Sequence, residues 1–136
     1  MRYIFLAIVG MVLLGSCKKA VEQTQLDALM KLITSGQWKV TSFKKDATDI
    51  TSQFADYKFQ FKEEGTVDAI KDGRVDKTGT WAGNTTNLSI QSSFGAVEAP
   101  LNLLNGTWYV TKTSLTFVES NQQVNGETHF LRLDKL

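Results

Sequence analysis

The residue types that most often carry out chemistry are scarce in this chain. It has one histidine, His129, and one cysteine, Cys17. A nucleophilic site needs a base beside the nucleophile, and a zinc site needs several histidine or cysteine ligands. His129 stands in an alternating segment beside Phe130 and has no cysteine or acidic cluster near it in the sequence. We therefore expect His129 to be structural, and we expect no catalytic residue and no metal site.

Carboxylates are more numerous, but their spacing fits no known site. Asp46 and Asp49 in "DATD" carry oxygens that suit calcium, yet the glycine-turned loop of a calcium hand is missing. We interpret this segment as a polar loop. No glycine-rich loop of the phosphate-binding or dinucleotide-binding type is present, so we expect no cofactor. A carboxylate pair at the mouth of a barrel would suit glycoside hydrolysis, and this alternative stays open.

The first residues have the layout of a secretory signal peptide. "MRYIFLAIVGMVLLGSC" has a positive charge at Arg2, an apolar run from Ile4 to Leu14 and then small residues. The apolar run is shorter than the roughly 20 residues that a membrane-spanning helix needs. We predict a signal peptide over residues 1–16, a tether over residues 17–24 and one domain over residues 25–136.

The end of this segment, "LLGSC", resembles the lipobox of bacterial lipoproteins. The resemblance implies cleavage before Cys17, acylation of that cysteine with fatty acids such as palmitate, and attachment to the outer membrane. Lysines follow Cys17 where an acidic stretch marks surface export in related lipoproteins, so the periplasmic side is favoured. Several acyl chains anchor a protein durably, since each buried CH₂ contributes roughly 0.8 kcal/mol.

The charge of the chain excludes one class of partner. The sequence has 15 basic and 14 acidic residues, and the loss of residues 1–16 removes only Arg2. The mature chain is therefore formally neutral. A nucleic-acid-binding domain carries a basic excess on one face, so we expect no nucleic-acid partner. We expect a monomer.

The mature chain begins with a helical pattern and then changes to strands. Leu26, Leu29, Met30 and Ile33 have helical spacing, and Gly36 is a stop signal. Strand-like runs separated by turn dipeptides such as Asp-Gly and Asn-Gly follow. About eight are expected, over residues 37–44, 56–62, 65–71, 77–82, 87–92, 106–112, 114–119 and 128–134. The sequence predicts an all-β fold, a closed antiparallel barrel of roughly eight strands preceded by one short helix.

Each of the three tryptophans follows a glycine by two residues, at the start of a predicted strand. Glycine allows the backbone to bend or to approach a neighbour, and tryptophan then offers a large apolar surface to the core. The order of short helix, Gly36, Trp38 and antiparallel strands resembles the lipocalins, and most of all the small lipocalin-like lipoproteins of Gram-negative bacteria. The resemblance covers about residues 25–136. It implies that Trp38 closes the barrel floor and that Arg132 packs across it; the threonine-aspartate turn of larger lipocalins is replaced by "TKTS".

The alternation points nine apolar side chains inward, and an eight-stranded barrel has room for them or for one small ligand. Two of the nine are Leu88 and Leu115; the seven candidate ligand contacts are Val40, Phe59, Phe61, Trp81, Ile90, Val110 and Phe117. We expect the barrel to bind a small apolar or amphipathic molecule at an open end, with polar loops over residues 46–53 and 92–99 at the rim. The alternative is a non-enzymatic interaction module with a filled core that contacts another envelope protein or a glycan.

Overall fold

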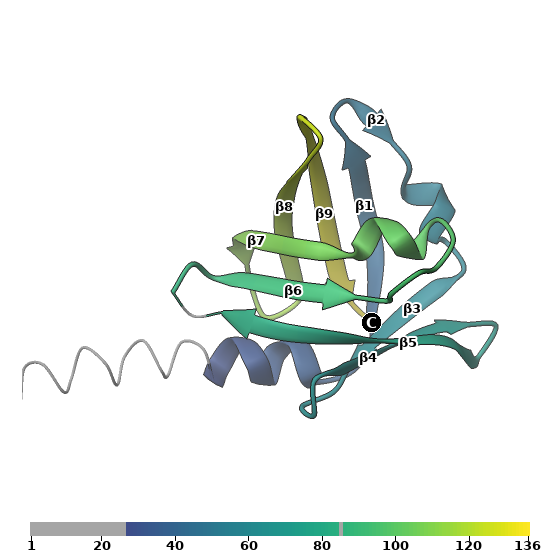
Figure 1. Ribbon diagram of the computed structural model, residues 1–136. Helices are drawn as coiled ribbons and strands as arrows, with labels where there is room; N and C mark the ends of the chain where they lie inside the picture. The colour runs from purple at the N-terminus through teal and green to yellow at the C-terminus, as the bar shows by residue number, and fades with distance from the viewer. Residues whose placement is uncertain (1–26, 85) are drawn as a thin grey trace, which may run out of the picture.

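The computed structural model describes residues 27–84 and 86–136, and these residues form a helix followed by strands (Figure 1). The helix, called the N-terminal helix here, covers residues 27–34 of the described chain. The described strands and 3₁₀ helices are β1 (Trp38–Lys45), β2 (Thr48–Asp49), η1 (Thr51–Phe54), β3 (Tyr57–Phe61), β4 (Thr66–Lys71), β5 (Arg74–Asn84), β6 (Ser89–Ser93), η2 (Leu101–Leu104), β7 (Gly106–Thr113), β8 (Phe117–Val124) and β9 (Glu127–Lys135).

The strands close into a barrel. Each strand from β3 to β9 pairs antiparallel with the next, and β1 pairs with both β9 and β3. The β1–β3 seam is short, with one pair between Trp38 and Phe59. The two-residue β2 only extends β1 as a hairpin. In Figure 1, β1, β8 and β9 stand upright while β5, β6 and β7 run across the view. The prediction of an eight-stranded antiparallel barrel preceded by one short helix is confirmed.

Two of the predicted turn dipeptides form tight hairpins. Asp72-Gly73 joins β4 to β5 and Asn125-Gly126 joins β8 to β9, and all four residues have positive φ. Such angles match the twist of the flanking strands, which explains the preference for Asn-Gly and Asp-Gly. Gly83-Asn84, another dipeptide that is typical of turns, forms the last two residues of β5 instead.

The glycine before each tryptophan has its own structural reason. Gly36 ends the helical segment with a φ of 75°, a conformation that costs glycine little. A Cβ on Gly79 would lie 2.5 Å from the backbone oxygen of Ser93 and 2.9 Å from the Phe94 ring, and one on Gly106 would lie 2.6 Å from Gln122 Oε1. All three tryptophans are buried. The glycine is therefore needed for a helix end at Gly36, and for close contact with neighbouring atoms at Gly79 and Gly106.

The N-terminal helix lies across one end of the barrel. The Trp38 indole Nε1 donates to the carbonyl of Ile33 at 2.9 Å, and Lys135 Nζ donates to Ser35 Oγ at 2.6 Å. Ile33 is buried, and Leu29 and Met30 are partly buried against the core. Trp38 is thus buried at this end of the barrel and bonded to the helix.

The opposite end is covered by the two 3₁₀ helices. Phe54 of η1 is fully buried and stacks on Phe43 of β1, with ring centroids 5.2 Å apart. Leu101 and Leu104 of η2 are also buried. Residues 46–53 form β2 and most of η1, so this segment caps the barrel end; it does not form a polar rim around an opening.

Candidate functional site

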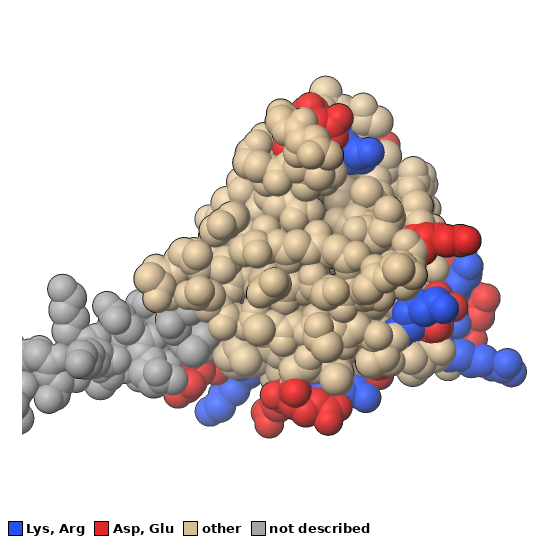
Figure 2. Space-filling view, in the orientation of Figure 1, with Lys and Arg blue, Asp and Glu red and all other residues tan. Residues whose placement is uncertain are grey.

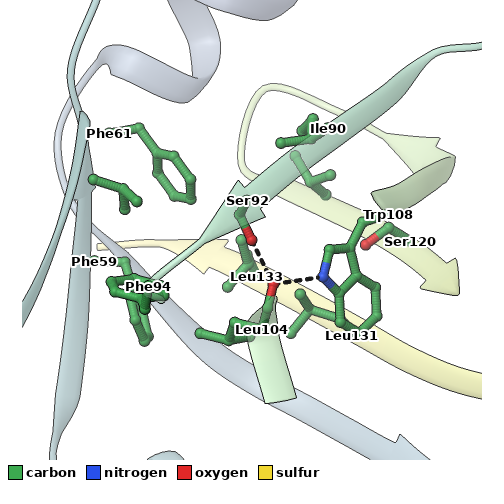
Figure 3. Close-up of a pocket in the computed structure, with 12 residues that line it drawn as sticks. Phe59, Phe61, Ile90, Ser92, Phe94, Leu104, Trp108, Ser120, Leu131 and Leu133 are labelled. Atoms are coloured by element: carbon green, nitrogen blue, oxygen red, sulfur yellow. Dashed lines mark hydrogen bonds between the residues drawn. The ribbon is translucent and has the colours of Figure 1, made fainter. Parts of the chain in front are cut away.

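The barrel encloses an apolar cavity of about 50 Å³ (Figure 3). Its walls come from β3, β4, β6, β7, β8 and β9 and from η2. Because side chains alternate along a strand, pairs of lining residues two positions apart share the inward face. The lining residues are Phe59, Phe61, Val67, Ile90, Ser92, Phe94, Leu104, Trp108, Val118, Ser120, Leu131 and Leu133.

The polar groups at the cavity wall are largely paired with each other. Ser92 Oγ and Trp108 Nε1 both donate to the carbonyl oxygen of Leu104, the indole at 3.0 Å (Figure 3). None of the lining residues carries a charge. The Ser120 hydroxyl is the remaining polar side-chain group of the wall. A wall that is mostly apolar favours apolar contents, since a polar guest would lose most of its bonds to water without replacement.

The cavity reaches toward the N-terminal helix. Phe61, Ile90 and Leu133 are its partly exposed apolar lining residues, whereas the other apolar lining residues are buried. Leu133 lies two positions from Lys135, which binds the end of the helix. Phe61 and Ile90 lie two positions from Glu63 and Leu88, which flank the helix on its two sides. The helix therefore crosses the end of the barrel at which the cavity is exposed.

The size of the cavity limits what fits without rearrangement. A water molecule needs on the order of 10–15 Å³ by this measure, and an engineered cavity of about 150 Å³ binds benzene. At about 50 Å³, the present cavity accepts a methyl or a few methylene groups. Aromatic packing fills much of the remaining interior, including the edge-on contact of Phe61 with Trp81 at 5.6 Å and that of Phe43 with Trp108 at 5.7 Å.

Three of the seven predicted ligand contacts, Phe59, Phe61 and Ile90, line the cavity. Val40 is buried in the core but is not part of the cavity wall. Trp81 is also buried outside the wall, and its Nε1 donates to the Lys62 carbonyl at 2.9 Å.

Val110 and Phe117 lie elsewhere. Val110 contributes to a groove beside the N-terminal helix. Phe117 faces outward on β8, with the Arg132 guanidinium 4.1 Å from the centre of its ring. The expected inward positions of Leu88 and Leu115 are wrong, because these side chains are 45% and 83% exposed. They belong to turns, where the strand alternation no longer applies.

Arg132 corrects an expectation taken from the resemblance. Its neighbours on β9, Leu131 and Leu133, line the cavity, so Arg132 points outward, away from Trp38. It pairs with Glu119 at 3.0 Å and Asp134 at 2.9 Å. The pKa of the Asp134 carboxyl is lowered, first by its hydrogen bonds from Arg132. The cation–π contact exists, but its ring is Phe117.

The residues considered for catalysis or metal binding make contacts within the fold. Asp46 Oδ1 accepts from the Thr128 amide at 2.8 Å, and Asp49 Oδ1 accepts from the amide and hydroxyl of Thr51. His129 is buried, and its Nε2 lies 3.1 Å from Glu127 Oε2. Within the described residues, no three histidine, cysteine, aspartate or glutamate side chains come together as a metal site would require.

Two predictions fall on the first part of the chain. Cys17 and the signal peptide lie outside the described residues. Over residues 27–84 and 86–136, no helix combines the length and the apolar character needed to cross a membrane.

Several cavity residues were not predicted from the sequence. Trp108 follows a glycine like the other tryptophans, and Leu131 and Leu133 alternate in "HFLRL", so these three had a usable signal. Phe94 and Leu104 come from the irregular connection between β6 and β7, where no periodicity indicates an inward face.

The fold is similar to that of a solved bacterial protein. The crystal structure of a DUF4847 family protein from Bacteroides vulgatus matches with a TM-score of 0.56 and 14% sequence identity, over 78% of this chain and 96% of that chain. At this identity the likeness concerns the barrel fold alone. No family model matches the sequence, and no curated protein matches it significantly.

Proposed function

We propose that the chain is a lipid-anchored envelope protein whose barrel binds a small apolar molecule, or the apolar end of an amphipathic one, beneath the N-terminal helix. The observation that carries this proposal is the uncharged, mostly apolar cavity, in which two polar wall atoms, Ser92 Oγ and Trp108 Nε1, already bond to Leu104. Binding pockets for small molecules are mostly apolar, with few polar groups. We propose no catalytic step.

The helix sets the size of the ligand. Ligand pockets measure roughly 300–1,000 Å³, and the cavity of about 50 Å³ is smaller. The helix is joined to the barrel by hydrogen bonds from Trp38 and Lys135 and by partly buried Leu29, Met30 and Leu32. A guest larger than a few carbon atoms therefore has to displace the helix from the end of the barrel.

Titration of the full-length chain with fluorescent fatty-acid analogues of increasing chain length tests this function. Trp108 lines the cavity, so binding should quench tryptophan emission, and a Trp108→Phe variant should lose most of that signal. Ile90→Gln, at the exposed side of the cavity, should weaken binding at least about tenfold, since it places an amide in an apolar site. Phe117→Gln is the matched control, because Phe117 faces outward under Arg132. Equal effects of the two variants would contradict binding in the cavity.

The interaction module with a filled core is the second candidate. Its support is the small cavity volume together with the aromatic packing that fills the barrel. In that case no analogue of any length quenches the tryptophans, and bound lipid is absent from the purified chain by native mass spectrometry. Saturable quenching that depends on chain length would reject this candidate.

The anchor is proposed from the sequence "LLGSC". Cells grown with radiolabelled palmitate should label the wild-type chain, and Cys17→Ala should lose both the label and membrane association. Fractionation should place the wild type in the outer membrane, and protease added to intact cells should leave it uncut if it faces the periplasm. Equal labelling of the Cys17→Ala chain and the wild type would contradict the proposed lipid anchor at Cys17.

A further inference from the structure

An apolar groove separates the N-terminal helix from two neighbouring hairpin turns. We call it the hairpin groove. Its lining comes from the helix, from the β5–β6 turn and from the β7–β8 hairpin: Ala28, Leu29, Leu32, Leu88, Val110, Thr113, Ser114 and Leu115. The groove lies outside the barrel and shares no lining residue with the cavity.

Two leucines occupy turn positions where leucine is unusual. Leu115, between β7 and β8, is 83% exposed, and Leu88, before β6, is 45% exposed. Leu88 also has a φ of 49°, a left-handed conformation that asparagine and glycine adopt far more easily than leucine. An exposed leucine in this conformation costs backbone strain and leaves apolar surface in contact with water. Such local exceptions concentrate at functional sites.

The lining of the groove lacks charge. None of its lining residues is ionisable, and the sequence from Thr78 to Val97 contains no charged residue. Figure 2 shows an uncharged surface at the side of the molecule where the β5–β6 turn lies, while lysine, arginine and acidic side chains gather at the bottom, at the top and on the opposite side. A partner recognised through salt bridges finds no counterpart here.

The N-terminal end of the described chain lies at the hairpin groove. Ala28 and Leu29, among the first described residues, line the groove. Cys17 precedes Asp27 by ten residues in the sequence, and ten residues span at most about 35 Å. An anchor at Cys17 therefore holds Asp27, at the start of the helix that lines the hairpin groove, within that distance of a bilayer.

We propose that the hairpin groove docks on the surface of a phospholipid bilayer, with Leu88 and Leu115 inserted among the acyl chains near the headgroups. This inference rests on the membrane anchorage in the proposed function and is independent of ligand binding in the cavity. The occupant is the apolar part of the lipid, because the groove offers no cation to a headgroup. Docking orients the barrel so that the end crossed by the N-terminal helix faces the membrane.

Photocrosslinking of the full-length chain tests the contact. The chain is reconstituted into phosphatidylcholine vesicles doped with a phospholipid that carries a diazirine near the carbonyl end of its acyl chain, and the crosslinked residues are mapped by mass spectrometry. We expect labelling of residues 86–88 and 113–116. Val75 is an internal control, because it is 56% exposed and stands beside the charged residues Arg74 and Asp76. Its labelling should be at least about tenfold lower.

The variants Leu115→Ser and Leu88→Asn complete the test. Each should reduce crosslinking at its own hairpin about tenfold, since loss of a buried leucine side chain weakens partition by roughly that factor. Labelling should persist at 0.5 M NaCl, because screening affects charge contacts and not apolar ones. Equal labelling of Val75 and Leu115, or no labelling of either hairpin, would overturn the proposal. A Leu115-dependent dimer without lipid labelling would assign the groove to a second copy of the chain and would also overturn it.

The same samples separate the two proposals. The mass of the N-terminal peptide reports whether Cys17 is acylated. Acylated chains without hairpin labelling would leave the anchor standing and overturn the docking, whereas hairpin labelling of unacylated chains would do the reverse.

Discussion

Adding one methylene to the cavity wall should stabilise the protein. Val118 is buried and lines the cavity. At about 24 cal/mol for each Å³, an empty cavity of about 50 Å³ costs the folded state about 1 kcal/mol. A newly buried methylene contributes about 0.8 kcal/mol. We therefore expect Val118→Ile to raise the free energy of unfolding by about 0.5–1 kcal/mol.

Val40→Ile is the matched control for this substitution. Val40 is also buried but lies outside the cavity wall, so an added methylene meets a packed core. Overpacking of this kind costs about 1–3 kcal/mol. Urea unfolding followed by tryptophan fluorescence measures both variants, and the opposite signs of the two changes are the result to look for.

The reasoning fails if Val118→Ile destabilises the protein as much as Val40→Ile does. That result would mean that the space beside Val118 is not available to a side chain, and hence not to a ligand. Val118→Ile should also weaken binding of the shortest fatty-acid analogue, because the methylene takes the space into which the ligand extends. A more stable variant with unchanged binding would place the ligand outside the cavity.

Three further predictions concern stability. Trp38→Phe removes the indole donor to the helix carbonyl and should cost about 1–3 kcal/mol in urea unfolding; an unchanged midpoint would contradict the contact. A double-mutant cycle should give about 0.5–1 kcal/mol of coupling between Arg132 and Phe117 and none between Arg132 and Trp38. Coupling of Arg132 to Trp38 and not to Phe117 would instead support the packing of Arg132 across Trp38 that the sequence resemblance implied. The pKa of Asp68 is lowered, first by the hydrogen bond from the Thr78 hydroxyl. The ionised carboxylate therefore stabilises the fold fully above the unfolded pKa of about 4, and this contribution is lost as the pH falls further. Asp68→Asn should make the free energy of unfolding less dependent on pH below 4, and a pH profile identical to that of the wild type would reject this role.

The barrel was predictable because its signals are local and repeated. Asp72-Gly73 and Asn125-Gly126 mark tight hairpins on their own, and the alternation in β3 and β9 places Phe59 and Leu131 inward without knowledge of the neighbours. The helix followed by Gly36 is equally local. None of these signals depends on contacts between distant parts of the chain.

The direction of the β8 side chains was not predictable for a physical reason. The apolar residues Leu115 and Phe117 suggested one inward face, but the observed strand begins at Phe117 and turns Val118 and Ser120 inward. Side chains alternate with a period of two, so an error of one residue in register exchanges the two faces. The sequence does not reveal which face of β8 points inward, because the inward face includes the polar Ser120 and the outward face includes the apolar Phe117, which Arg132 covers.

The same inversion bears on both proposals. A strand that directs serine inward and phenylalanine outward does not follow the apolar-in pattern that folding alone favours. Outside, the Phe117 ring is shielded by Arg132, which Glu119 and Asp134 hold in place. Leu115, two residues earlier at the hairpin tip, has no such cover and is 83% exposed. Phe117 is thus shielded, whereas Leu115 at the hairpin groove is left exposed. Solubility in water does not explain this difference, but contact of the hairpin groove with lipid, as proposed above, does.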